Sequence, residues 1–419
     1  MSPDTLQSLH PGYSSLVIGS EQHRGQIVVS APVSFSGNVT LQNTGGGGSP
    51  GGIQLSAPLT SSGTVTLASA GDITQQAGAP VTAANLLIHA TNPSANVTLD
   101  SPANLVVTLA ADPPANFSFY NNAALTIGAL SGTGYSALSN APVSLSVAGS
   151  SAYERFFVRA AGNLTLNQSI STLGPNPAIG PSIELVTGGR LINNAGATAL
   201  APYAGENWLV RAYTYEGETR NGLDPGNAQP NFYGCSLDGS CVAGVVVPST
   251  GNHFIYEQQP LVTVRADDQL VTVGSAGRGL SFSLDGLVNG DTAGDVLVGS
   301  LSSTATRYSP VGLYAITQAT EFASPVGYRV SFVAGQVGVE ALPDIYVSPE
   351  RDRSGESGET NVHGRNIGVP PMCVATGPLM AEGGGQGMDL LDLEWSRVRL
   401  KPNVTNCIAL SERNTCQSF

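Results

Sequence analysis

Five cysteines carry the most distinctive chemistry in this sequence, namely Cys235, Cys241, Cys373, Cys407 and Cys416. Two of them lie close together in the segment NFYGCSLDGSCVAG, and two bracket the end of the chain in NCIALSERNTCQSF. Close pairs in loops are typical of disulfides, which persist in oxidising compartments. A zinc site is disfavoured because no histidine lies near either pair. We therefore expect Cys235–Cys241 and Cys407–Cys416 bonds, whereas the partner of Cys373 stays open.

Histidines and carboxylates give little support for catalysis. The histidines, His10, His23, His89, His253 and His363, are scattered, and no G-x-S-x-G, HExxH or P-loop motif is present. A polysaccharide-processing enzyme would need two or more acids converging on one face. The candidates for that alternative are Glu154, Glu184, Glu206 and Glu216. We expect no catalytic residue and no cofactor, and the protein is predicted not to be an enzyme.

Local motifs bear on metal binding and on glycosylation. The acidic run Asp285, Asp291 and Asp295 lacks the spacing of an EF-hand, so a solvated turn is favoured over calcium and no metal site is expected. Asn-x-Ser/Thr sequons are candidate glycosylation sites, although some arise by chance in a chain rich in these residues. They begin at Asn38, Asn96, Asn116, Asn163, Asn167 and Asn403.

A repeated pattern of short apolar alternations indicates the elements that position these residues. In residues 63–100 the apolar pairs Val65–Leu67, Leu86–Ile88 and Val97–Leu99 are separated by small polar turns, a pattern of strands with one buried face. Similar phrases return at 25–41, 123–130, 141–147 and 161–170, roughly every 15–25 residues. Such a unit buries its apolar face by stacking on the next copy. The sequence therefore predicts an all-β chain beginning with a right-handed parallel β-helix.

Charge restricts the function classes. The formal net charge is -13, and between residues 25 and 150 the only charged residues are Asp72, Asp100 and Asp112. Nucleic acid or an anionic membrane would require clustered Lys and Arg, and the sequence shows no such cluster. No stretch has the roughly 18–20 apolar residues of a membrane span, and residues 1–15 show neither the basic nor the apolar region of a signal peptide. The cysteines favour the downstream part of a longer secreted protein over a cytoplasmic one.

Changes in composition divide the chain into five expected parts. A solenoid over 1–210 is followed by a capping and disulfide-loop region over 211–258 and a small mainly-β module over 259–342. A linker over 343–387 and a partly extended, disulfide-closed segment over 388–419 complete it. The last coil needs a cap, and Trp208, Tyr213 and Tyr215 are expected to supply it. The same aromatic residues could instead form a carbohydrate-binding patch.

GDITQQAGAPVTAANL (71–86) and LHPGYSSLVIGS (9–20) resemble the haemagglutinin-type repeats of the filamentous haemagglutinin family, the exoproteins of two-partner secretion systems. GLVNGDTAGDVLVGSL (286–301) with GLYAITQATEFASPVGYRVSFVAGQVGVE (312–340) resembles the MBG modules that follow such solenoids. The chain lacks the N-terminal secretion domain of that family. The resemblance implies an adhesin or exoprotein fragment, secreted or held at the bacterial cell surface in association with the outer membrane.

The C-terminal cysteine loop resembles that of the high-molecular-weight adhesins of the same secretion class. That resemblance implies that Cys407 and Cys416 tether the protein to an outer-membrane TpsB-type transporter, whereas a plain stapled terminus is the alternative. The implied ligand is a host, bacterial or glycan surface of unknown identity, with neither nucleic acid nor an integral membrane span involved. Function is thus expected to be adhesion by a rigid stalk and binding surface. The alternative is a secreted β-helix enzyme acting on polysaccharide.

Overall fold

The computed structural model describes residues 13–45, 51–275, 277 and 279–342, and these are nearly all β-structure. Their one α-helix is the short α2 (Ala293–Val296). One compact unit comprises Met1–Val271 with Ala276–Val339, and the other comprises Thr272–Ser275 with Glu340–Phe419. Most of the second unit lies outside the described residues. The first unit contains a solenoid and nearly all of a small β-module.

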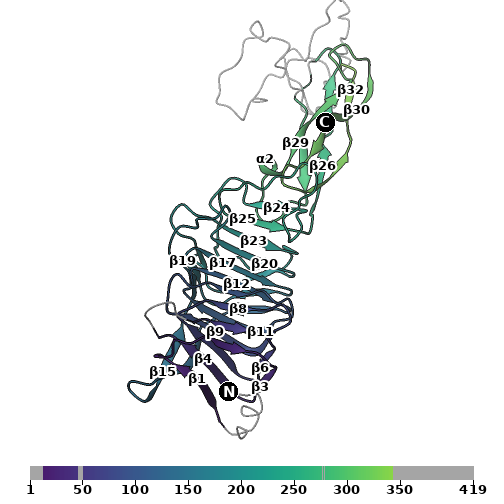
Figure 1. The fold of residues 1–419 in the computed structure, drawn as a ribbon. Coiled ribbons are helices and arrows are strands. Elements are labelled where there is room, and N and C mark those ends of the chain that lie inside the picture. The colour runs from purple at the N-terminus through teal and green to yellow at the C-terminus, as the bar shows by residue number, and fades with distance from the viewer. Residues whose placement is uncertain (1–12, 46–50, 276, 278, 343–419) are drawn as a thin grey trace, which may run out of the picture. The chain divides into compact units, whose positions relative to one another are not determined.

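Two ten-stranded parallel sheets, here called sheet A and sheet B, form the solenoid (Figure 1). Sheet A contains β1 (Ser15–Ser20), β3 (Val33–Phe35), β4 (Asn38–Asn43), β6 (Leu59–Ser61), β7 (Thr64–Ser69), β9 (Val81–Ala90), β11 (Leu105–Asp112), β13 (Leu125–Ile127), β18 (Leu164–Leu166) and β21 (Leu191–Asn193). Sheet B contains β2 (Ile27–Val29), β5 (Ile53–Leu55), β8 (Ile73–Gln75), β10 (Val97–Leu99), β12 (Asn116–Asn121), β17 (Arg155–Ala160), β20 (Ile183–Thr187), β23 (Trp208–Ala212), β25 (His253–Tyr256) and β24 (Asn231–Tyr233). A third parallel sheet contains β16 (Ser150–Ala152), β19 (Ile170–Thr172) and β22 (Leu200–Ala201).

Register places like residues above one another inside the stack. Leu41 aligns with Leu67, and Leu67 aligns with Ile88, and all three are buried. Further along, Phe117 stacks on Phe156 with their ring centroids 4.8 Å apart. Each coil thus buries its inward row against the next coil, as the repeat pattern predicts. The predicted parallel β-helix followed by a small β-module is confirmed.

Buried asparagines at the corners bind the backbone of neighbouring turns. Asn104 donates through Nδ2 to the carbonyls of Leu99 and Tyr120, and its Oδ1 accepts from the amide of Val81. Asn121 similarly donates to Val106 O and accepts from Val106 N. The partners lie at or next to the ends of strands, where the ladder leaves backbone groups unpaired, so these side chains satisfy them where water is excluded.

One predicted coil is instead a hairpin. Residues 141–147 repeat the apolar alternation, but β15 (Ala141–Val147) pairs antiparallel with β14 (Leu130–Ser136). An alternating pattern indicates a half-buried strand but not the strand with which it pairs. It therefore does not distinguish a coil of the solenoid from a strand of a hairpin. The hairpin lies on the outer face of sheet A, where Leu145 and Val147 pack on Leu87 and its neighbours. Thr40 Oγ1 also donates to the carbonyl of Thr133 at 2.7 Å.

The module consists of two small sheets. One contains β28 (Phe282–Asp285), β26 (Leu261–Ala266) and β31 (Arg329–Val333), in that order. The other contains β27 (Gln269–Thr272), β32 (Gly335–Glu340), β30 (Gly312–Ala323) and β29 (Val298–Ser303). Its core includes Ile316, Val337 and Val339. The linker expected at 343–387 and the segment at 388–419 lie outside the described residues.

Candidate binding surface

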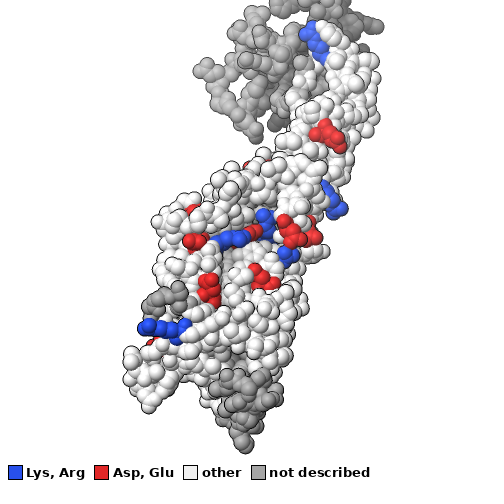
Figure 2. Space-filling view, viewed as in Figure 1, with Lys and Arg blue, Asp and Glu red and all other residues white. Residues whose placement is uncertain are grey.

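Charged side chains gather in a band across the solenoid, on a surface otherwise almost free of charge (Figure 2). On the outer face of sheet B, Glu184 receives a hydrogen bond from Arg155 Nη2 at 2.7 Å and another from Arg211 Nε at 3.0 Å. Glu184 and Arg211 are largely covered, with side chains 14% and 15% exposed. Among the described residues Arg211 Nη1 is buried without a hydrogen-bond partner. Glu184 is therefore held by two arginines, one of which keeps a buried donor without an acceptor.

Two aromatic rings lie among these charges. Tyr120 and Phe157 are partly buried on adjacent strands, with ring centroids 5.7 Å apart. The guanidinium carbon of Arg155 lies 5.1 Å from the centroid of Phe157, and that of Arg159 lies 5.8 Å from that of Tyr120. Such cation–π contacts hold a guanidinium in place while leaving its N–H groups free to donate. We call these six residues the arginine band, namely Tyr120, Arg155, Phe157, Arg159, Glu184 and Arg211.

The predicted Cys235–Cys241 disulfide is present and closes a tight loop. Within it, Ser236 N donates to Ser240 O and Gly239 N donates to Ser236 O. The loop returns to the arginine band, because Arg159 Nη1 donates to Asp238 Oδ1 at 2.6 Å. At the next residue, a Cβ on Gly239 would lie 3.8 Å from Arg211 Nη2. A covalently closed loop thus lies against two arginines of the band.

A row of uncharged polar side chains leads into the band along the same face. In register, Gln54 aligns with Thr74, Thr74 with Thr98, and Thr98 with Ser118. Ser118 then aligns with Phe157 of the band. Since these positions alternate with inward aliphatic residues, their amide and hydroxyl groups point outward. We call Gln54, Thr74, Thr98 and Ser118 the polar ladder.

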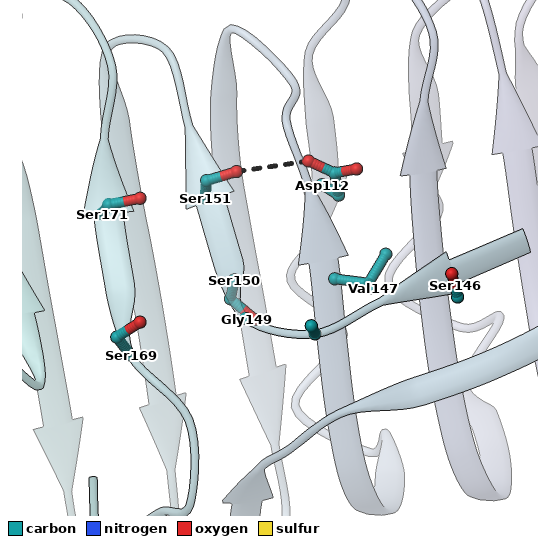
Figure 3. A pocket seen from close by; sticks show the side chains of 9 residues that line it. Asp112, Ser146, Val147, Gly149, Ser150, Ser151, Ser169 and Ser171 are labelled. Atoms are coloured by element: carbon teal, nitrogen blue, oxygen red, sulfur yellow. Dashed lines mark hydrogen bonds between the residues drawn. The ribbon is translucent and has the colours of Figure 1, made fainter.

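A separate polar cavity of about 250 Å³ lies at the base of the β14–β15 hairpin (Figure 3). Its lining includes the hydroxyls of Ser151, Ser169 and Ser171 and the carboxylate of Asp112. Ser151 Oγ donates to Asp112 Oδ1 at 3.4 Å, and His89 Nδ1 lies 3.8 Å from Asp112 Oδ2. The carboxylate lies between the serine and the histidine, so the histidine does not contact the hydroxyl as a base would in a nucleophilic triad. The cavity offers hydrogen bonds and no activated nucleophile.

The last coil joins the module through a buried polar cluster. Asp291 accepts hydrogen bonds from Tyr233 OH, Tyr328 OH and Asn231 Nδ2, at 2.8, 2.7 and 2.6 Å. Burial, followed by the nearby Asp291 carboxylate, raises the pKa of the Tyr233 phenol. Burial and the hydrogen bond to Asp291 also raise the pKa of Tyr328. Both phenols therefore stay protonated and donate at neutral pH.

A buried ion pair, Arg220 with Glu218, lies in the final coils. Arg220 Nη2 donates to Asn231 Oδ1 at 2.7 Å and to Tyr256 OH at 2.6 Å, and its Nε donates to Glu218. Tyr256 OH donates in turn to Glu218 at 2.8 Å. Burial raises the pKa of Glu218, and the positive charge of Arg220 opposes that rise. Every member of this cluster has a partner, as burial of charge requires.

The residues predicted as a cap occupy different environments. Trp208 is buried in β23, with β20 on one side and β25 on the other, so the parallel stack continues beyond it. Tyr213 is 52% exposed, whereas Tyr215 packs edge-on against Tyr233 and Tyr256. The aromatic rings of the final coil are Phe232, Tyr233, Phe254 and Tyr256, all buried. The predicted capping region at 211–258 therefore includes strands of the stack.

The acids weighed for an enzyme have separate partners. Glu154 accepts from Asn116 Nδ2, and Glu184 accepts from the two arginines. Glu206 accepts from the Asn176 amide, and Glu216 accepts from Gln258 Nε2. Each of these four carboxylates thus accepts from a different group.

Sequon asparagines differ in the use of their side-chain amide nitrogen. Asn116 Nδ2 donates to Asn96 and to Glu154, whereas Asn96 acts as an acceptor in that pair. Asn38 and Asn163 use Oδ1 to accept from a backbone amide of the next coil, and Asn167 Oδ1 accepts from Asn194. Asn38 and Asn167 are exposed. Asn403, Cys373, Cys407 and Cys416 lie outside the described residues.

Sequence reasoning missed the arginine band because its members are distant in the chain. The charge pattern predicted no basic cluster, yet the sheet places Arg159 and Arg211 on the two strands that flank Val186, which aligns with both. A signal exists in the repeated phrases FVRA (157–160) and LVRA (209–212), whose arginines occupy equivalent strand positions. Alignment of the repeats, and not spacing along the chain, would have revealed the cluster.

Comparison with known proteins identifies the module alone. The family model of the MBG domain (YGX type) matches residues 262–337. No curated protein and no solved structure matches the chain. MBG domains are found in large adhesin-like surface proteins, and the match together with the parallel sheets fits a surface adhesin-like protein. In the described part of the chain, no helix is long and apolar enough to cross a membrane.

Proposed function

We propose that this protein is an adhesin-like exoprotein of a two-partner secretion system, displayed at the outer surface. The observation that carries the proposal is the continuity between the solenoid and the MBG-type module. Tyr233 N donates to Val326 O at 2.8 Å, and Asp291 of the module accepts from the last coil. Ten sheet B strands, at roughly 4.8 Å each, give a stack on the order of 45 Å high. A stack of that kind can serve as a rigid spacer with a long lateral surface.

Tethering is assigned in this proposal to the Cys407–Cys416 loop. An extended chain can pass through a narrow transporter, whereas a covalently closed loop resists passage, so the loop would hold the C-terminus at the outer membrane. The test replaces Cys407 and Cys416 with Ser in the cells that make the protein, and compares the cell-bound with the released fraction. We expect release of the double variant, and release of the wild type by a reducing agent.

A matched control removes the other disulfide. The Cys235→Ser/Cys241→Ser variant should remain cell-bound, because its loop lies in the solenoid region and not at the terminus. Equal retention of wild type and of the Cys407→Ser/Cys416→Ser variant would contradict the tether. An adjacent gene for a TpsB-type transporter would support the secretion route.

The proposed role is non-enzymatic. The four candidate acids have separate hydrogen-bond partners, and Glu184 is held between two arginines. Incubation of the purified chain with a panel of polysaccharides should therefore release no reducing sugar. Release of reducing sugar that is lost in Glu184→Gln would contradict this assignment.

A further inference from the structure

We infer that the arginine band and the polar ladder together bind an acidic polysaccharide, whose carboxylates displace Asp238 from Arg159. The inference rests on the proposed function in that it names the ligand class of the displayed surface. It begins from an imbalance of partners in the described residues. Three arginines of the band share two carboxylates, those of Glu184 and Asp238, and Arg211 Nη1 has no acceptor.

The pair between Arg159 and Asp238 is the exchangeable one. The Asp238 side chain is 75% exposed and that of Arg159 is 35% exposed, so solvent weakens their attraction. Glu184, by contrast, is only 14% exposed and is held by two donors. An incoming carboxylate can therefore replace Asp238 while Glu184 continues to hold the other two arginines in place. Asp238 acts as an internal substitute for the ligand.

The shape of the surface favours a polymer. Small ligands are usually bound in concave sites, whereas the band lies on the outer face of a sheet and continues along the polar ladder. A polymer lying along this face meets hydroxyls and amides on the ladder, then aromatic rings and arginines on the band. Sugar rings present hydroxyls and apolar faces, and uronic acids add a carboxylate that fits a guanidinium fork.

The test measures binding of the purified full chain to polygalacturonate, with neutral dextran and poly-glutamate as comparison polymers. Arg159→Gln and Arg211→Gln each remove one charged donor, and we expect each to weaken polygalacturonate binding about tenfold. Arg265→Gln is the matched control, since Arg265 is an exposed arginine of the module. Dextran should not bind, and poly-glutamate should bind more weakly than polygalacturonate because it lacks sugar rings.

A gain-of-affinity variant separates binding from folding. Asp238→Asn removes the internal competitor, and we expect it to bind polygalacturonate about twofold to fivefold more tightly, the range set by a weak exposed pair. Asp285→Asn, which removes an exposed carboxylate of the module, should leave the affinity unchanged. A misfolded variant cannot reproduce this increase, so the result is informative even if Arg211→Gln is unstable.

Three results would overturn the inference. The first is equal affinity of Arg159→Gln and Arg265→Gln for polygalacturonate. The second is equal affinity of Asp238→Asn and Asp285→Asn for the same polymer. The third is binding of poly-glutamate as tightly as polygalacturonate. Because the measurement uses purified protein, it does not depend on surface display. A chain that binds polygalacturonate but is not retained on cells contradicts the proposed display alone, and a retained chain that does not bind contradicts this inference alone.

Discussion

At the scale of single residues, several charges of the described part of the chain are closely paired. The Glu218 and Arg220 side chains are only 6% and 20% exposed, and they share hydrogen bonds with Tyr256 and Asn231. Such a cluster contributes to stability only while it is complete, because a lone buried charge is expensive. The cluster therefore makes the final coils sensitive to the loss of one member.

Removal of Arg220 should be strongly destabilising. In Arg220→Gln the Glu218 carboxylate loses its cation, and we expect the free energy of unfolding to fall by about 3–5 kcal/mol at neutral pH. The pKa of Glu218, already raised by burial, should rise further. Because the folded-state pKa of this carboxyl is raised, the free energy of unfolding falls as pH increases through that pKa. The destabilisation of Arg220→Gln should therefore be smaller in acid. Urea unfolding at pH 4 and pH 7 measures this difference.

The double variant Glu218→Gln/Arg220→Gln is the control for that prediction. It removes both charges and should recover much of the lost stability, because no unpaired charge remains buried. A double variant as unstable as Arg220→Gln at both pH values would show that the packing of Arg220 over Phe254, at 3.9 Å from the ring centroid, matters more than its charge.

Alkaline pH should loosen the junction with the module. The pKa values of Tyr233 and Tyr328 are raised in the folded chain, whereas in the unfolded chain phenols titrate near 10. Above about pH 10 the unfolded state therefore binds fewer protons than the folded state, and stability falls as pH rises. Unfolding followed by circular dichroism from pH 8 to 12 should show this loss.

The tyrosine variants identify the source of the alkaline effect. Tyr233→Phe/Tyr328→Phe should be less stable at pH 8, since Asp291 loses two hydrogen bonds, yet its stability should fall less between pH 10 and 12. Tyr308→Phe changes a phenol that is 78% exposed and should keep the wild-type profile. Identical alkaline profiles for all three proteins would place the effect elsewhere.

At the scale of elements, the β14–β15 hairpin is an addition to the solenoid and not one of its coils. Its Leu145 and Val147 cover Ala68, Leu87 and Ala110 on the outer face of sheet A. These residues form a cluster separate from the main core. The main core contains Leu86 and Ile88, the neighbours of Leu87 in β9. The hairpin thus protects an apolar strip without supplying the inner core.

Deletion of the hairpin should expose this strip while leaving the coils folded. Replacement of residues 130–147 by a short Gly-Ser linker should retain the β-sheet circular dichroism and increase the fluorescence of a hydrophobic dye. Leu86→Ala, which removes a fully buried side chain from the main core, should instead cost about 2–5 kcal/mol. Loss of cooperative unfolding in the hairpin deletion would mean that the coils need the hairpin to fold.

The elements could be predicted to different degrees from sequence, for physical reasons. Val65, Leu67, Leu86 and Ile88 revealed the coils because the inward row of a half-buried strand alternates with polar residues. Ala141–Val147 alternates equally well and was wrongly included, since alternation does not specify the partner strand. The arginine band was missed because Arg159 and Arg211 are distant in the chain and are placed on either side of β20 only by sheet register. The Cys235–Cys241 bond was predicted because its half-cystines are near neighbours in the chain.

At the scale of the whole molecule, the charge distribution has a further consequence. From residue 25 to 150 the solenoid has three charged residues, while the charged clusters described above lie in the later coils and at the module. Coils held by aliphatic contacts and neutral amides have little to gain or lose from protons or dissolved ions. The early coils are thus suited to tolerate swings of acidity and salinity, and such swings would be sensed mainly in the later coils and at the junction with the module.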